Sequence, residues 1–371
     1  MTQIEDTLVI RRVMDRGCKK AKKSWEYGAA SEALLEFYDP EFSVFGANPF
    51  PKGELPIVST DLASLDFVSQ FIDVNSRILI GGDGSSGDPA SIGVFAEMIA
   101  SSDPSYRDAC QRQSEAVLAA PRWPNGAISH REEYAALWAD FVYMAPPFLA
   151  YHAVATNDLS LMQQAIEQCL LYGEVLGQDS SEPLHGAWRH IVGPQLEDLG
   201  IWATGNGWAA GGMTRVLATA KKWPRSSEWE DRHMKLQHLI LGIINSAIEA
   251  GGRGTPPLLC NFLDDTTWFD DAGSTAMLSA VAYRMAILAP DLCEARHIKF
   301  AEQSREAVMA HVDRQTGRVS PTPQEGLPGW TVNEASAEGS SQGHSFVVMM
   351  HSAYRDWLNV QHARRSQGPS G

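Results

Sequence analysis

Helical periodicity recurs along almost the whole chain and constrains the fold more than any other feature of the sequence. Apolar residues return every three to four positions in one segment after another, whereas the strict alternation of strands is rare. The sequence therefore predicts an all-α protein. We expect its helices at residues 4–24, 28–38, 60–76, 89–101, 105–119, 131–145, 147–156, 158–175, 206–222, 228–250, 272–288, 294–312 and 342–358.

Several of these helices have recognisable start and stop signals. Asp88-Pro89 is typical of an N-cap followed by proline at the first helical position. Asn157 or Asp158 is expected to cap the helix at 158–175. Gly251-Gly252 is expected to end the helix at 228–250.

The connections between the predicted helices are alternately short and long. Long loops in a compact domain are usually functional or disordered, and these contain Trp, His, Asp and Asn, so we interpret them as functional. Such a pattern predicts a closed ring of helical hairpins, with the long loops gathered around a pocket on one face. The long connections are 39–58, 77–88, 120–130, 176–205, 251–270 and 313–341.

No linker divides the chain, so we expect a single domain over residues 1–362. The polar segment 363–371 is expected to be a disordered tail. The N-terminus lacks the basic and apolar regions of a signal peptide, and no apolar run is long enough to cross a membrane. We therefore expect a cytoplasmic protein, as a monomer or a homodimer.

Composition narrows the classes of partner. The 371 residues carry a net charge of -15, which argues against nucleic acid or an anionic membrane surface as a partner. The five cysteines are scattered and show no paired spacing, so we expect free thiols and neither a zinc site nor a disulfide framework. They are Cys18, Cys110, Cys169, Cys260 and Cys293.

Asp140 is the first candidate for chemistry, because it is the only formal charge between Glu133 and Asp158. A segment this apolar is expected to be buried, and an unpaired carboxylate there should gain proton affinity. A carboxyl group that keeps its proton near neutral pH can act as an acid catalyst. The structural alternative is an Asp bonded to backbone or to a buried Arg.

Asp88 is the second candidate carboxylate, although an ordinary helix cap is a strong alternative for an Asp before Pro. It follows the glycine-rich segment 81–87, which lacks the spacing of a known phosphate-binding motif. Four further acids cluster at Asp264, Asp265, Asp270 and Asp271. Calcium-loop spacing is absent there and two of the four are expected to cap a helix, so we predict no metal site.

Aromatic residues in the predicted loops point to a sugar ligand. The chain has 11 tryptophans, and flat aromatic faces suit the apolar faces of sugar rings. Filling of the core is the alternative for any single one. Those in loops or at helix ends are Trp25, Trp123, Trp188, Trp202, Trp208, Trp223, Trp268 and Trp330.

Two motifs stand beside these tryptophans. Gly205-Asn206-Gly207, between Trp202 and Trp208, opens a predicted helix and allows close approach of the backbone to a ligand. His185 lies beside Trp188 in the loop just before this turn, and His130 occupies a similar place before the Asp140 segment. His190 is less distinctive, and a surface position is expected for it.

These motifs occur together in a known family. Trp25-x-x-Gly28, Asp88, Leu137-Trp-Ala-Asp140-x-x-Tyr-Met-Ala-Pro-Pro-Phe-Leu-Ala, His185-Gly-x-Trp, Gly205-Asn-Gly-Trp208, Ser274-Thr-Ala-Met277 and Glu338-Gly-x-x-Gln342-x-x-Ser-Phe346 follow one another in order. In this the chain resembles the unsaturated glucuronyl and rhamnogalacturonyl hydrolases of glycoside hydrolase families 88 and 105. The resemblance runs from about Trp25 to about Trp357, and the stretch around Asp140 is its most specific part.

The resemblance implies an (α/α)6 barrel and a particular chemistry without a cofactor. Members act on the 4,5-unsaturated uronate that a polysaccharide lyase leaves at a non-reducing end. A carboxylic acid donates a proton to C4, water adds at C5, and the resulting hemiketal opens and releases the neighbouring sugar. By this resemblance Asp140 is the proton donor and activates the water, and Asp88 positions substrate and water.

Further site residues follow from the same resemblance. His185 and His130 match positions that contact the unsaturated sugar, and Trp138 and Trp208 match aromatic walls of the pocket. Trp25, Asn206 and Thr204 complete the expected substrate-binding set. Many members have Arg where this chain has Thr204, and a hydroxyl supplies neither its charge nor its bidentate fork. Arg189 or Arg215 could take over that role.

The expected function is therefore an unsaturated uronyl hydrolase whose partner is an unsaturated oligosaccharide. Two alternatives remain open on the same barrel. One is a sugar epimerase or an ordinary glycosidase, for which histidines in the loops would serve. The other is a non-catalytic sugar-binding barrel, which the loss of Arg at position 204 would favour.

Overall fold

Six helices form a closed inner ring in the computed structural model, which describes residues 3–324 and 331–366. Around this ring α4 contacts α7, α7 contacts α9, α9 contacts α11, α11 contacts α13, and α13 contacts α2. The short helix η2 (Asp88–Ile92) closes the ring between α2 and α4. The inner helices are α2 (Ser24–Tyr38), α4 (Gly93–Ala100), α7 (Pro146–Thr156), α9 (Ala203–Lys222), α11 (Ala272–Leu288) and α13 (Ser341–Ser366).

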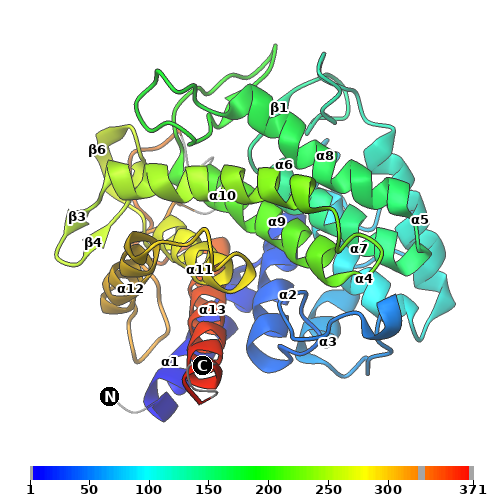
Figure 1. Cartoon of the computed structure of the whole chain (residues 1–371), viewed down its shortest axis with the longest axis horizontal. Helices are drawn as coiled ribbons and strands as arrows, with labels where there is room; N and C mark the ends of the chain where they lie inside the picture. The colour runs from blue at the N-terminus through cyan, green and yellow to red at the C-terminus, as the bar shows by residue number, and fades with distance from the viewer. Residues whose placement is uncertain (1–2, 325–330, 367–371) are drawn as a thin grey trace, which may run out of the picture.

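An outer layer of helices packs against this ring. α3, α5, α8, α10 and α12 each contact the inner helix that precedes them in the chain, and α1 lies beside α13, the last inner helix (Figure 1). The fold is thus the (α/α)6 barrel expected from the sequence. The outer helices are α1 (Gln3–Lys20), α3 (Ala63–Ser69), α5 (Pro104–Leu118), α8 (Leu159–Leu176), α10 (Glu230–Ala250) and α12 (Ala295–Ala310).

The two layers differ in their patterns of burial. All residues of α9 from Ala203 to Ala220 are buried, and many are Ala, Gly or Thr, which let neighbouring helices approach closely. The outer helix α5 buries one face, which includes Cys110 and Val117, and exposes the other. The outer helices therefore carry the clearest apolar stripe in the sequence.

Helix ends follow the predicted signals in two of three cases. The Asp158 carboxylate caps α8 by accepting hydrogen bonds from the backbone N–H groups of Ser160 and Leu161. Gly251, with φ of 64°, ends α10. The predicted cap at Asp88 is wrong, because Asp88 is the first residue of η2 and its side chain caps no helix end.

The predicted helix at 131–145 is also wrong. The strand β1 (Leu137–Trp138) pairs with β2 (Ile191–Val192), and only α6 (Phe141–Met144) is helical there. The reason is local, since the Ser129 hydroxyl accepts hydrogen bonds from the backbone N–H groups of Arg131 and Ala136 and holds this stretch as a turn.

Two other segments differ from expectation. The connection 251–270 contains the hairpins β3 (Arg253–Gly254) with β4 (Pro257–Leu258) and β5 (Cys260–Phe262) with β6 (Asp265–Asp270). Helix α13 continues through Ser366, so residues 363–366 of the expected disordered tail are helical, and 367–371 lie outside the described residues. In the described segments, no helix has the length and apolar content needed to span a membrane.

Candidate active site

The loops that lead into the inner helices are joined to one another by backbone hydrogen bonds. The Ser86 N–H, just before η2, donates to the His130 carbonyl at 2.9 Å. The Ala139 N–H, just before α6, donates to the His190 carbonyl at 2.9 Å. These bonds bring together four segments that are far apart in the sequence. Asp88, His130, Asp140 and His190 are thereby gathered at one end of the barrel.

Asp140 lies against a buried histidine. Its Oδ2 atom is 3.3 Å from Nε2 of His190, and the other ring nitrogen of His190, Nδ1, is 2.9 Å from Oδ2 of Asp198. The His190 ring is completely buried, so the surface position expected for it is wrong. The expectation of an uncompensated Asp140 is also wrong, since an imidazole and not a guanidinium faces it.

The pKa of His190 lies above its ordinary value because two opposing causes do not balance. Burial alone would lower it, but the hydrogen bonds and negative charges of Asp140 and Asp198 together raise the pKa of His190. A raised pKa favours the doubly protonated ring, which places a positive charge beside Asp140.

Asp88 is the carboxyl group of this cluster that holds its proton near neutral pH. Burial raises the pKa of Asp88 to about 7, and the negative charge of Asp140 adds to the rise. The Ser85 side chain and the Arg131 charge oppose this effect without cancelling it. The charge of Asp140 thus acts directly on Asp88, so the two carboxyl groups lie within electrostatic reach of each other.

His130 and Trp138 form one wall of the cluster. The His130 ring stacks on the Trp138 ring with centroids 4.7 Å apart, and His130 Nε2 lies 4.0 Å from Oδ1 of Asp88. Burial lowers the pKa of His130 to about 3, so this ring is neutral. Trp138 also meets the His190 ring edge-on, at 6.0 Å between centroids, and its half-buried position suits a pocket wall.

The Gly205 turn approaches the cluster closely, whereas the Thr204 side chain is turned to another partner. A Cβ atom at Gly205 would lie 3.4 Å from the His190 ring and 3.5 Å from Ala139. The Thr204 hydroxyl donates at 2.9 Å to the buried carboxylate of Asp271, which caps α11. Thr204 is itself buried, so its hydroxyl has a structural role in place of the substrate contact expected from the sequence.

Asn206 also has a structural partner set. Its amide oxygen accepts from the Trp188 N–H, and its amide nitrogen donates to the carbonyls of Trp188 and Trp202. All three bonds are buried, so Asn206 fixes the loop around Trp188 to the start of α9. Asn206 thus has a structural role in place of the substrate contact expected for it.

Trp208 and Trp25 differ in how near they lie to the cluster. Trp208 is buried between the rings of Tyr143 and Phe346, each 4.5 Å away, so it fills the interior of the barrel. Trp25 is half-buried at the start of α2. Its neighbour Ser24 accepts a hydrogen bond from Ser91 of η2, which places this helix start beside the segment of Asp88.

His185 is exposed on the loop before β2 and is not joined to the cluster by any contact in the described residues. Its Nδ1 atom lies 3.4 Å from the Gln178 carbonyl, and its own carbonyl accepts a hydrogen bond from Ser246 of α10. His190, five residues later, occupies the place beside Asp140. The sequence offered one signal for His190, which is that it ends the same loop as His185 and Trp188.

Most loop tryptophans fill the core. Trp188, Trp202 and Trp223 are buried, and among them only the Trp202 ring contacts the His190 ring, at 4.5 Å. Trp330 lies outside the described residues.

The two arginines considered as replacements for the missing family Arg have different surroundings. Arg215 is buried in ion pairs with Glu36 and Glu32 and is therefore not available to a substrate. Arg189 is half-buried. A third arginine, Arg131, was not considered from the sequence, yet its charge acts on both Asp88 and His130. Its Nη2 donates to the Asp83 carbonyl at 3.1 Å.

The four acids near Thr266 serve separate structural roles. Asp271 caps α11, Asp264 accepts a hydrogen bond from the Ile201 N–H, and Asp270 pairs with Arg253. Only one of the four thus caps a helix, where two were expected. Within residues 3–324 and 331–366, no group of three or more His, Cys, Asp or Glu side chains is arranged to hold a metal ion.

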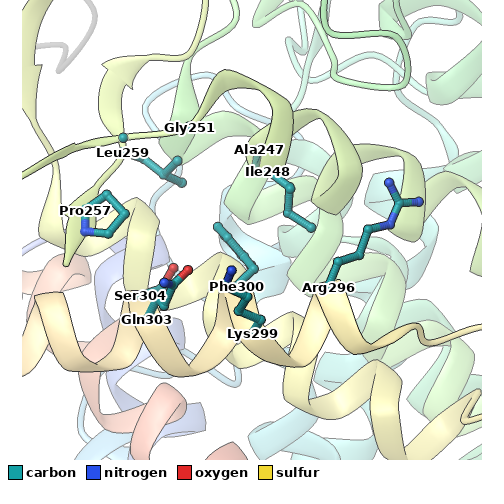
Figure 2. A pocket seen from close by; sticks show the side chains of 11 residues that line it. Ala247, Ile248, Gly251, Pro257, Leu259, Arg296, Lys299, Phe300, Gln303 and Ser304 are labelled. Atoms are coloured by element: carbon teal, nitrogen blue, oxygen red, sulfur yellow. The ribbon is translucent and has the colours of Figure 1, made fainter. Parts of the chain in front are cut away.

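A surface groove on other elements lacks the chemistry of the acid cluster. A cavity of about 240 Å³ lies between the end of α10, β4 and α12, with Phe300 and Leu259 on its walls and Arg296 and Lys299 at its rim (Figure 2). Its lining includes two cations and no carboxylate, so acid catalysis is not possible there.

Comparisons with known proteins show what this chain resembles in sequence and in fold. Residues 89–243, which include Asp140 and His190, match the profile of Glycosyl Hydrolase Family 88. No curated protein matches the chain.

Solved structures share the fold along nearly the whole chain. A possible member of glycoside hydrolase family 105 from Salmonella enterica serovar Paratyphi A is 15% identical, with a TM-score of 0.73 over 96% of this chain and 95% of that one. An unsaturated glucuronyl hydrolase specific for heparin is 12% identical, with a TM-score of 0.61 over 96% of each chain.

An α-1,6-mannanase from Salegentibacter sp. is also similar, at 13% identity and a TM-score of 0.63 over 95% of this chain and 99% of that one. Identities this low show the fold alone. The sequence match and the shared barrel together confirm the resemblance of this chain to glycoside hydrolase families 88 and 105.

Proposed function

We propose that the protein is a glycoside hydrolase that removes a 4,5-unsaturated uronate from the non-reducing end of a lyase-generated oligosaccharide. The observation that carries this proposal is the pair of Asp88 and Asp140, in which Asp88 is buried with a raised pKa and His190 faces Asp140. Hydration of an enol ether needs one positioned proton and one base for water, and this cluster offers both.

The proposed reaction begins with the His190–Asp140 pair. The Nε2 proton of His190 passes to Asp140, and Asp140 delivers it to C4 of the unsaturated ring. Positive charge then develops at C5 and the ring oxygen. Asp140, again a carboxylate, takes a proton from the water that adds at C5 and returns it to His190. The hemiketal opens, and the neighbouring sugar leaves with its glycosidic oxygen.

Asp88 is proposed to stay protonated through these steps. A neutral carboxyl group can donate a hydrogen bond to a sugar hydroxyl or to the attacking water, whereas a second carboxylate would repel an anionic substrate. The neutral ring of His130, 4.0 Å from Asp88, can contact the sugar without adding charge. Trp138 offers a flat face for the ring.

Arg131 is proposed to bind the uronate carboxylate in place of the Arg that many family members have at position 204. Arg131 is half-buried and follows His130 in the chain, and its guanidinium donates to a backbone carbonyl, which leaves further N–H groups for a ligand. Its positive charge acts on Asp88, so it lies within electrostatic reach of the cluster.

A panel of lyase-generated disaccharides tests this function. The protein should remove the ultraviolet absorbance of the C4=C5 double bond and release a free sugar, with little turnover of the matched saturated disaccharides. Faster turnover of a saturated glycoside would favour an ordinary glycosidase, as the likeness in fold to a mannanase allows. A product of the same mass as the substrate would favour an epimerase, and binding without any product a non-catalytic barrel.

A further inference from the structure

Asp198 has a position that the resemblance does not explain. It lies in the turn after β2, where its backbone exchanges two hydrogen bonds with Ile191, at 2.8 and 3.0 Å. One carboxylate oxygen, Oδ1, accepts from the Gly200 N–H at 3.1 Å. The other, Oδ2, lies 2.9 Å from Nδ1 of His190. The turn therefore fixes this carboxylate against the buried ring.

The two ring nitrogens of His190 face two carboxyl groups. A carboxylate can only accept hydrogen bonds, and a neutral imidazole can donate only one. Both contacts are satisfied together only if the ring carries two protons or one of the acids carries one. A doubly protonated ring satisfies both contacts without placing a proton on either acid.

We propose that Asp198 is a positioning residue for the reaction, which holds the His190 ring doubly protonated with its Nε2–H directed at Asp140. This inference rests on the proposed function, because the proton that Asp198 holds on His190 is the one that Asp140 delivers to C4. In this role Asp198 acts through His190 and not on the substrate directly. It acts by keeping the proton on His190 between turnovers and by fixing the orientation of the ring.

The other groups around His190 leave this role to Asp198. Asp140 faces Nε2 from the segment before α6, and Asp198 faces Nδ1 from the turn after β2. The His130 ring, which stacks on Trp138, adds no charge beside His190, because burial lowers the pKa of His130 to about 3. Gly205 and Trp202, which pack against the ring from the start of α9, carry no charge. Two carboxylates face His190, and Asp198 is the one that lies outside the proposed acid pair of Asp88 and Asp140.

Asp198→Asn tests the proposal, since it keeps the shape and removes the charge. Glu197→Gln is the matched control, because Glu197 is an exposed acid in the same turn. Histidine ring resonances of isotopically labelled full-length protein should show the midpoint of His190 lower in Asp198→Asn by about one pH unit or more. The same midpoint should be unchanged in Glu197→Gln.

Activity gives an independent readout. In Asp198→Asn, kcat on an unsaturated disaccharide should fall about tenfold or more at neutral pH, with KM little changed, and should recover as the pH is lowered and His190 regains its proton. A loss that is equal at all pH values, or a His190 midpoint that does not move, would overturn the role of Asp198. If the wild-type protein turns over no unsaturated sugar, the proposed function fails, while the histidine titration still decides the proposal for Asp198.

Discussion

The Nε2 atom of His190 lies 3.3 Å from Oδ2 of Asp140, inside a cluster that buries the histidine completely. A carboxylate beside an imidazolium is a proton acceptor that already has a proton within reach. This relationship differs from the isolated, uncompensated acid expected from the apolar sequence around Asp140. In the proposed reaction the acid–histidine pair, and not one carboxyl group, is therefore the unit that exchanges protons with the substrate.

The pH dependence of turnover should reflect Asp88. Its pKa is raised to about 7, so its proton is lost as the pH rises through about 7. The second carboxylate that forms would then repel the uronate and add negative charge beside Asp140. We expect kcat/KM of the wild-type protein to fall above about pH 7. The Asp88→Asn variant should be slower at pH 6 and should lose the part of this alkaline fall that Asp88 causes, while the part caused by loss of the His190 proton remains. An unchanged alkaline limb would contradict the role of Asp88.

Stability should depend on the same carboxyl group. In the unfolded chain Asp88 titrates near its ordinary value of 3.8, whereas the folded protein holds its proton up to about pH 7. Between these values the folded state binds a proton that the unfolded state has lost, so the free energy of unfolding decreases as the pH rises. Below pH 3.8 both states are protonated and Asp88 has no effect.

Asp88→Asn removes this titration and keeps the shape. Its Tm relative to the wild-type protein should therefore be higher at pH 8 than at pH 4. Burial also raises the pKa of Glu32 to about 7, so the pH dependence of the wild-type Tm contains contributions from both groups. The difference in Tm between Asp88→Asn and the wild-type protein isolates the contribution of Asp88. An equal difference in Tm at both pH values would argue against a raised pKa.

Asn206 should matter for stability more than for substrate affinity. Asn206→Ala removes three buried hydrogen bonds and leaves the Trp188 N–H without a partner, which should lower the free energy of unfolding by about 2–4 kcal/mol. Denaturant unfolding measures this cost. Asn75→Ala is a suitable control, since Asn75 is exposed on a loop. A fully stable Asn206→Ala protein with a much higher KM would instead restore the substrate contact expected from the motif.

Arg131 should set the affinity for the uronate. Arg131→Gln removes the charge, so KM for an unsaturated uronate should rise about tenfold or more, with a smaller change in kcat. Arg131→Lys should restore only part of the affinity, because a lysine has no bidentate fork. Arg189→Gln, a half-buried arginine in the loop before β2, serves as the comparison. If Arg189→Gln has the larger effect, the carboxylate site belongs to Arg189.

The sequence predicted the barrel because helix periodicity and loop length are local properties. Each outer helix carries an apolar stripe, and the long loops 77–88, 120–130 and 176–205 lead to the cluster. The long loop 39–58 does not, because it packs at the opposite end of α9, where Lys222 and Trp223 donate hydrogen bonds to its carbonyls. The stretch at 131–145 escaped this reasoning because its apolar residues fit a helix, while side-chain bonds from Ser129 impose a turn. Such bonds depend on geometry that composition does not encode.

The candidate site was predicted in part. Asp88, His130, Trp138 and Asp140 were named from the sequence and lie together in the structure. Pairing between β1 and β2 brings His190 and Asp198 to Asp140, and a pairing of two-residue strands 54 positions apart leaves no readable pattern. Asn206 and Thr204 serve structural roles that the motif did not reveal, because Asn206 bonds the start of α9 to the loop around Trp188 and Thr204 bonds it to Asp271.

The rate at which the wild-type protein and Asp140→Asn remove the C4=C5 absorbance of one unsaturated disaccharide tests the central claim most directly. Asp140→Asn keeps the shape of the side chain but can neither deliver nor accept the proton, so the rate should fall by about a thousandfold or more while Tm stays within a few degrees. A folded Asp140→Asn protein that keeps more than about a tenth of the wild-type rate would contradict the account.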